Sequence, residues 1–150
     1  MIFYKPQFFS IQELFSEDLY AKYEKNCLRW MDSRLLYTAD QIRKRYNRSM
    51  IINDWHMGGV LENRGFREPD CKTGAFLSDH KFGGAIDFNI SGVSPEEIRC
   101  DILANPDIDD FKYISTIEMQ VSWVHIAIRN RNKKYLNIEL IYPYGKEKNK

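Results

Sequence analysis

The chain of 150 residues contains only three cysteines, eight glycines and three histidines, and its formal net charge is +1. Cys27, Cys71 and Cys100 are odd in number and lack paired metal-ligand spacing, which argues against a disulfide framework, so we expect reduced thiols. A near-neutral charge disfavours nucleic acid or a membrane surface as the main partner. No stretch approaches the ~18 consecutive apolar residues of a membrane span.

The N-terminal segment also lacks the features of a secretory signal peptide. Its apolar character is interrupted by Lys5, Pro6, Gln7 and Gln12, and no small-residue cleavage site follows. We therefore expect a protein that is made as a cytosolic polypeptide. If its substrate lies outside the cytoplasm, another agent must deliver it.

The composition is sufficient for one folded domain with its own core. Hydrophobic residues make up 43% of the chain and aromatic residues 14%, and single domains commonly run to ~100–200 residues. Apolar periodicity and capping residues predict helices at about 10–25, 38–46 and 94–104, and strands at about 50–55, 85–90, 112–118, 121–128 and 135–142. We predict a single α+β domain in which helices flank a mostly antiparallel sheet. Its parts are a helical lead-in at about 1–48, a core at about 50–142 and a short basic tail.

One stretch, residues 78–88, combines two potential metal ligands with a glycine bend. His80 and Asp87 are seven residues apart, and a fully extended chain would separate them by about 23 Å, too far for one ion. Gly83 and Gly84 permit the chain to fold back, since glycine reaches positive φ without a Cβ clash. In the strand that follows, apolar residues alternate toward the core, so Asp87 should face the opposite side with room for an ion.

A second stretch, residues 121–128, has the same alternation and contributes a third ligand. Its apolar residues face the core, while Trp123 and His125 share the opposite face. His80, Asp87 and His125 together form a three-ligand set. Catalytic zinc sites keep three protein ligands and leave the fourth position to water, whereas structural zinc sites more often use four ligands rich in cysteine. The sequence therefore predicts a catalytic-type zinc site in a cleft on one face of the sheet.

These residues resemble the signature of the zinc D-Ala-D-Ala carboxypeptidase family. The matched positions are Ser78-x-His80-x-x-Gly83-x-Ala85-x-Asp87, followed about forty residues later by Trp123-Val124-His125. The family includes VanX- and VanY-type enzymes, phage L-alanyl-D-glutamate endolysins and the hedgehog signalling domain, which shares the fold. Residues 51–59 and 64–67 resemble the segment that precedes the motif in phage members, so the resemblance covers roughly residues 50 to 128.

The resemblance implies a zinc metallopeptidase that hydrolyses amide bonds in bacterial cell-wall stem peptides. The type is either a D-Ala-D-Ala carboxypeptidase or a peptidoglycan endopeptidase. It also implies a phage-encoded or prophage-encoded enzyme that reaches the peptidoglycan through lysis or virion delivery. In the family an arginine in the cleft meets the substrate carboxylate or the developing oxyanion, and Arg67 stands at that position; the alternative for Arg67 is an ordinary salt bridge. His56 is either a substrate contact or a residue that packs beside Trp55.

The general base is predicted at Glu118. Several family members place a glutamate three residues before the last histidine, where this chain has Ser122, and other members carry it farther upstream across a hairpin. With a two-residue turn, Glu118 would lie opposite Val121, about 13 Å along the strand from His125. With a turn over residues 119–122, Glu118 would lie opposite Trp123, about 7 Å along the strand from His125.

Two further carboxylates are candidates for the general base, and one alternative function is open. Asp79 and Asp54 are reserve candidates for the base, and Ser78 and Asp79 are candidates to orient the His80 ring. Because Ser122 replaces a family glutamate, the alternative function is a zinc-binding structural or binding protein on the same fold without hydrolysis. The presence of a carboxylate near the metal would discriminate between the two functions.

Overall fold

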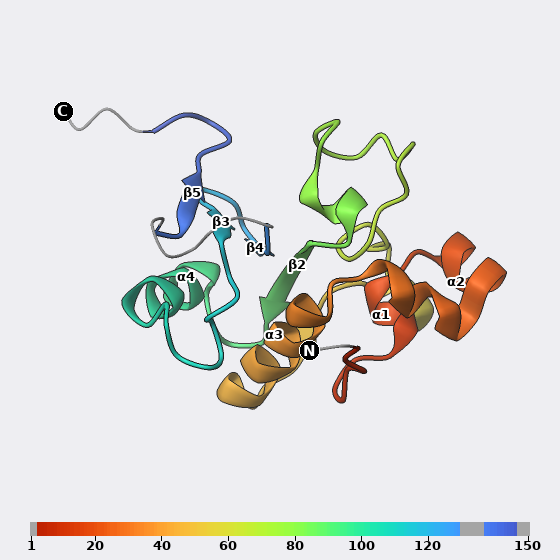
Figure 1. The fold of residues 1–150 in the computed structure, drawn as a ribbon, viewed down its shortest axis with the longest axis horizontal. Coiled ribbons are helices and arrows are strands. Elements are labelled where there is room, and N and C mark those ends of the chain that lie inside the picture. The colour runs from red at the N-terminus through yellow and green to blue at the C-terminus, as the bar shows by residue number, and fades with distance from the viewer. Residues whose placement is uncertain (1–2, 130–136, 147–150) are drawn as a thin grey trace.

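A five-stranded mixed sheet forms the centre of the fold, in the order β1-β2-β4-β3-β5 (Figure 1). The computed structural model describes residues 3–129 and 137–146. The strands are β1 (Met50–Ile51), β2 (Ala85–Ile90), β3 (Thr116–Glu118), β4 (Val124–Ala127) and β5 (Glu139–Ile141). The pairs β1–β2, β2–β4 and β4–β3 are antiparallel and β3–β5 is parallel. The α+β prediction is confirmed, and the parallel edge pair makes the sheet mixed.

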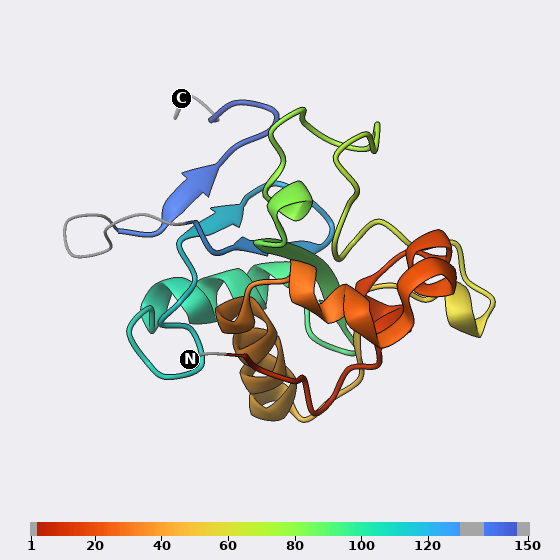
Figure 2. The ribbon, with the colours of Figure 1, turned by 45° about the vertical axis from the view of Figure 1, so that its right-hand side comes forward.

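Helices α3 (Ser33–Tyr46) and α4 (Pro95–Ala104) cover one face of this sheet. The other helical elements are α1 (Ile11–Leu14), α2 (Glu17–Tyr23), η1 (Glu24–Trp30), η2 (Trp55–Met57) and η3 (Asp79–Phe82), where η denotes a 3-10 helix. In Figure 2, α3 and α4 lie beneath the sheet, and the chain that leads into β2 arches over its other side. The two faces therefore differ: one is the helix-packed core and the other is covered by a long connection.

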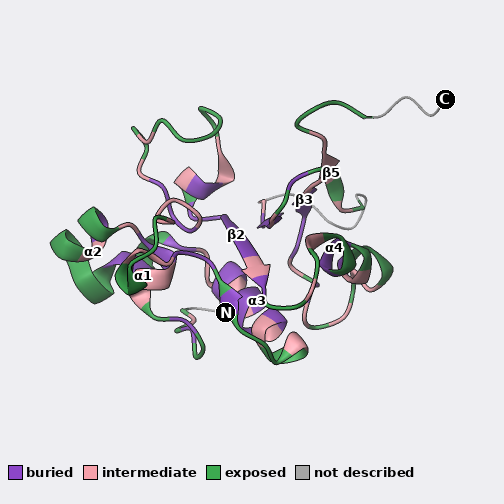
Figure 3. Cartoon of the chain, turned by 180° about the vertical axis from the view of Figure 1, so that it is seen from behind, coloured by how far each residue is buried: buried purple, intermediate pink, exposed green. Residues whose placement is uncertain are grey.

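The core is built by the alternation that the sequence predicts. Ile86 and Phe88 on β2, with Val124 and Ile126 on β4, are completely buried on the helix-packed side. Figure 3 shows β2 and much of α3 in the buried colour. The residues between them on each strand must then point to the opposite face, as strand geometry requires. That face carries the predicted metal ligands.

The prediction of one continuous helix over residues 10–25 is wrong, because the helix is interrupted at Phe15 and Ser16. Both residues have extended backbone, and the Ser16 hydroxyl accepts a hydrogen bond from the amide of Leu19 to start α2. Serine favours this capping position over a helix interior, which is why one periodic segment becomes two helices. The α4 prediction is confirmed, with Ser94 and Glu97 forming a reciprocal capping box.

Other boundaries also differ from prediction. Helix α3 begins at Ser33, earlier than expected, because the Asp32 carboxylate accepts from the Arg34 amide as its N-cap. The strand expected over residues 50–55 ends at Ile51. The strand predicted over 135–142 is seen as β5. Residues 135 and 136 of the predicted range, and residues 147–150 of the basic tail, lie outside the described residues. All three cysteines are free thiols, as predicted. The described residues include no helix with the length and apolar character needed to cross a membrane.

Asp40 on α3 fastens the N-terminal segment to the core. Its side chain is buried, and its carboxylate accepts hydrogen bonds from the Tyr4 hydroxyl at 2.7 Å, the Gln7 amide at 2.6 Å and the Phe8 amide at 3.1 Å. A buried carboxylate is tolerated only when hydrogen bonds replace its lost hydration. Asp40 is therefore the acceptor that holds residues 4–8 against α3.

We predict that Asp40→Ala lowers the free energy of unfolding by about 2–4 kcal/mol, because it leaves two backbone amides and a hydroxyl without their acceptor. Chemical denaturation followed by circular dichroism measures the change. Asp107→Ala is the matched control, because Asp107 is exposed, and should stay within about 0.5 kcal/mol of the unmodified protein. Equal stability of the two variants would show that the N-terminal segment does not depend on this carboxylate.

Candidate metal centre

The register of the sheet brings three polar side chains into one row. Asp87 on β2 lies directly opposite His125 on β4, and His125 lies directly opposite Glu118 on β3. Directly opposed residues of antiparallel strands point to the same face, with Cβ atoms about 4.5–5.5 Å apart. The row therefore presents a carboxylate, an imidazole and a second carboxylate on the face away from the helices.

His80 joins the row from η3, through the bend that the sequence predicts. Gly83 has φ +68°, and a Cβ at this position would lie 1.8 Å from the carbonyl oxygen of Trp30, so only glycine fits. Gly84 contributes differently from the prediction, since its φ is not positive. Its carbonyl accepts from the Ile128 amide at 2.7 Å, which fixes the start of β2 against the end of β4.

The potential ligand atoms converge with spacings that suit one ion. His80 Nε2 lies 3.3 Å from Asp87 Oδ2 and 3.3 Å from His125 Nδ1, while His125 Nδ1 lies 2.7 Å from Asp87 Oδ1. One ligand atom from each residue falls within 4.8 Å of the others. Tetrahedral ligands at about 2.0–2.1 Å from a metal would be about 3.3 Å apart. The predicted ligand set is thus assembled and could hold a metal ion: two of the three distances match this spacing, and the third, from His125 to Asp87, is that of a hydrogen bond.

A backbone carbonyl determines which nitrogen of His80 faces the cluster. His80 Nδ1 lies 2.7 Å from the carbonyl oxygen of Gly65, which can only accept, so Nδ1 carries the proton and Nε2 is directed at Asp87 and His125. Gly65, rather than Ser78 or Asp79, orients the ring. A Cβ on Gly65 would lie 2.0 Å from the Leu14 carbonyl oxygen, so this contact also requires glycine.

Asp87 keeps its negative charge despite being buried. Burial favours the neutral carboxylic acid, but hydrogen bonds and charge from His125 and His80 outweigh it and hold the pKa of Asp87 well below its usual range. When His80 is neutral, its Nε2 and the facing Asp87 Oδ2 are both acceptors. Two acceptors 3.3 Å apart need a cation between them, which a proton or a metal ion supplies.

Arg67 lies at the cluster, as predicted, with its guanidinium engaged by the protein. The residue is buried, and its Nη2 donates to Asp87 Oδ2 at 3.2 Å. Its Nε donates to the Asn63 carbonyl at 2.6 Å and its Nη1 to the Thr73 carbonyl at 3.4 Å. Each of the three nitrogens therefore has a protein acceptor. The contact of Arg67 with Asp87 is an ion pair that holds this carboxylate in place.

Glu118 lies closer to the metal ligands than either predicted hairpin allowed. Both predicted registers, opposite Val121 or opposite Trp123, are wrong, because Glu118 pairs with His125. The connection from β3 to β4 is longer than expected and turns at Gln120, which has φ +63°. Glu118 is half-buried and lines the same cavity as His80 and His125.

The other candidates take structural roles. Asp79 forms an ion pair with Arg129 at 3.0 Å, and Asp54 accepts from the Leu61 amide at 2.9 Å to close a turn. His56 is exposed, and its ring centroid lies 5.7 Å from that of Trp55, the packing alternative.

Two cavities meet at the cluster and share Arg67, Thr73, Asp87 and Trp123 in their walls. One, of about 410 Å³, contains His80, His125 and Glu118. The other, of about 540 Å³, extends along β2 past Asn89. The two cavities are therefore neighbours that flank the cluster.

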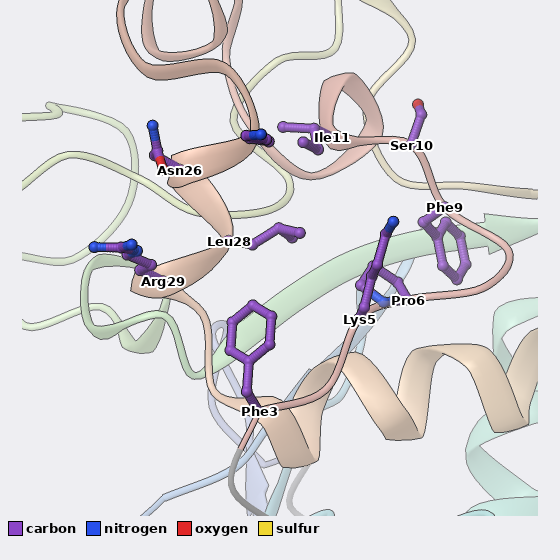
Figure 4. Close-up of a pocket in the computed structure, with 10 residues that line it drawn as sticks. Phe3, Lys5, Pro6, Phe9, Ser10, Ile11, Asn26, Leu28 and Arg29 are labelled. Atoms are coloured by element: carbon purple, nitrogen blue, oxygen red, sulfur yellow. The ribbon is translucent and has the colours of Figure 1, made fainter.

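A larger cavity than either of these lies elsewhere, between the N-terminal segment and η1 (Figure 4). It has about 620 Å³ and is walled by apolar side chains such as Phe9 and Leu28, with Lys5, Lys25 and Arg29 among its polar residues. No histidine, cysteine or acidic residue is among the described residues that line it. Cavity volume alone thus does not point to the cluster of potential metal ligands.

Comparison with protein family models, with curated proteins and with solved structures finds no match for this chain. A functional assignment therefore depends on the motif residues and on the geometry of the cluster.

We predict that the protein binds one divalent metal ion, and that His80→Ala and His125→Ala each abolish stoichiometric binding because each removes one of three ligands. Metal content after dialysis, measured by atomic emission, reports the loss. At metal concentrations 100 times the dissociation constant, bound metal should add about 2.7 kcal/mol of stability, which these variants lose. His56→Ala, which changes the remaining histidine, should behave as the unmodified protein. Stoichiometric metal in a variant that carries both His80→Ala and His125→Ala would exclude this site.

Proposed function

We propose that this chain is a zinc-dependent peptidase that hydrolyses amide bonds in bacterial cell-wall stem peptides. The observation that carries the proposal is the row of Asp87, His125 and Glu118, completed by His80. It supplies three potential ligands whose atoms lie within 4.8 Å of one another, and one further carboxylate on the strand position opposite His125. Two imidazoles and a carboxylate suit zinc among the common divalent ions. The choice of stem peptides comes from the motif resemblance, not from the cavity chemistry.

The residues of the chain divide the work of hydrolysis in a consistent way. A zinc ion held by the three ligands would polarise the amide carbonyl and lower the pKa of a bound water to about 7. Glu118, beside His125, accepts the proton of the attacking water and returns it to the departing amine. Arg67 keeps the Asp87 carboxylate in place, and Trp123 forms a wall common to both cavities.

Glu118→Gln tests the catalytic assignment separately from metal binding. The substitution preserves size and hydrogen bonding but removes the base, so zinc content should be unchanged while cleavage of purified peptidoglycan falls by about 10²–10⁴-fold. Product release followed by mass spectrometry measures the rate and identifies the bond. Glu17→Gln, on the exposed side of α2, is the control. Unchanged cleavage would remove Glu118 from the mechanism, and a zinc-loaded protein without any cleavage would favour the non-catalytic alternative.

Zinc retention should fall as the pH drops below about 6, because protons compete with the metal for imidazole ligands. Asp87 does not contribute to this loss, since its pKa lies well below its usual range and it stays ionised there. Dialysis against a chelator from pH 8 to 5, with thermal unfolding recorded at each pH, measures retention apart from denaturation. Cleavage should decline over the same range. Full zinc content and undiminished activity at about pH 5 would contradict histidine ligation.

A further inference from the structure

Arg64 is anchored beside the metal ligands by its backbone. Its amide donates to Asn53 Oδ1 at 3.0 Å, and its carbonyl accepts from the amide of Asp87 at 2.7 Å. The next residue, Gly65, supplies the carbonyl that orients His80. The position of Arg64 is therefore determined by the same backbone contacts that build the cluster.

The guanidinium of Arg64 has unused binding capacity. Its Nη2 donates to Asn89 Oδ1 at 2.6 Å, and among the described residues Nε and Nη1 have no acceptor and no carboxylate lies within ion-pair distance. The side chain is half-buried, so its guanidinium is partly desolvated. A partly desolvated cation without a direct anionic partner gains from binding one.

Arg67 contrasts with Arg64 in this respect. Its carboxylate partner is Asp87, and each of its nitrogens already donates to the protein. An anion that enters the cavity would have to compete with Asp87 for Arg67. Arg64 offers its free edge without displacing a carboxylate.

Asn89 presets the direction of the Arg64 side chain. Its Nδ2 donates to the carbonyl of Ser122 at 2.9 Å, which leaves Oδ1 directed at Arg64. Asn89 follows Asp87 by two positions on β2, so it lies on the same face, about 7 Å farther along the strand. An extended peptide covers that distance in about two residues. Arg64, Asn89 and Asp87 all line the 540 Å³ cavity.

We propose that Arg64, positioned by Asn89, forms a carboxylate subsite in this cavity and selects peptides with a free carboxylate within about two residues of the bond at the cluster. This inference deepens the proposed function and rests on it. Because the guanidinium is already held in place, little side-chain freedom is lost when the carboxylate binds. Glu62 also lines the cavity and disfavours a second acidic group there.

The test compares the binding of acetyl-dialanine with that of its C-terminal amide, in both L and D forms, by isothermal titration calorimetry. Glu118→Gln protein is used so that turnover does not consume the peptide. At least one stereoisomer should bind at least tenfold more tightly as the acid than as the amide, which is the scale of a charge-assisted hydrogen-bonded pair. Arg64→Gln should abolish this preference, and Asn89→Ala should weaken it. Arg48→Gln, which changes an exposed arginine, should retain it.

Thermal unfolding and zinc content establish that each variant is folded and loaded. If Arg64→Gln does not fold, Asn89→Ala and Arg64→Lys provide the comparison, since lysine keeps the charge but loses the planar fork. Equal affinity for acid and amide in protein that has Arg64, or no binding of either, overturns the subsite while zinc binding and peptidoglycan cleavage stand. Titrations on metal-free protein test the subsite independently of zinc, because Arg64 does not require zinc to bind a carboxylate. A preference for the acid that persists without metal supports the subsite even where the zinc assignment fails.

Discussion

The negative charge of Asp87 is the constraint on which the rest of the site depends. A carboxylate buried to this degree is stable only if surrounding donors replace its hydration. His125, His80 and Arg67 do so from three separate segments, so compensation of one charge also assembles the cleft. The same arrangement leaves acceptor atoms facing one another, which favours a shared cation. Folding stability and metal affinity are therefore coupled through a single side chain.

The helical lead-in supports this site through backbone contacts rather than side-chain chemistry. The carbonyl of Leu14 accepts from the Phe66 amide, and the carbonyl of Gly83 accepts from the Asp32 amide. The glycine positions 65 and 83 are packed so closely against the lead-in that no Cβ fits. Rigid scaffolding of this kind holds ligands in place before a metal binds, and preorganisation is what a catalytic centre requires. The helical lead-in is thus part of the scaffold that holds the His80, Asp87 and His125 cluster.

The two arginines near the cluster show how similar residues acquire different roles from their surroundings. Arg67 is neutralised by Asp87 and stabilises a ligand, whereas Arg64 bonds a neutral amide and keeps donors available. Both line the cavity that runs along β2. Arg67 thus maintains the cluster, while the proposed recognition of an anion is left to Arg64. The side chain of one arginine can therefore change without loss of the role of the other.

The sequence by itself determined which residues share each strand face, because alternation with a period of two follows directly from backbone geometry. That rule was enough to group Asp87 with His125, and the glycine bend was enough to add His80. The sequence also predicted α4, because the capping residues Ser94 and Glu97 lie within four residues at its start. Local patterns did not indicate the break at Ser16, because helical periodicity continues through it.

Only the tertiary structure decided the strand register and the partners of each charge. Glu118 lies opposite His125 because a five-residue connection turns at Gln120, where no glycine, asparagine or proline marks the turn. Arg67 pairs with Asp87 and Arg64 with Asn89, both of which lie on β2, more than 15 residues farther along the chain. Register and ion pairing are set by the packing of whole elements, so they become visible only when those elements are brought together.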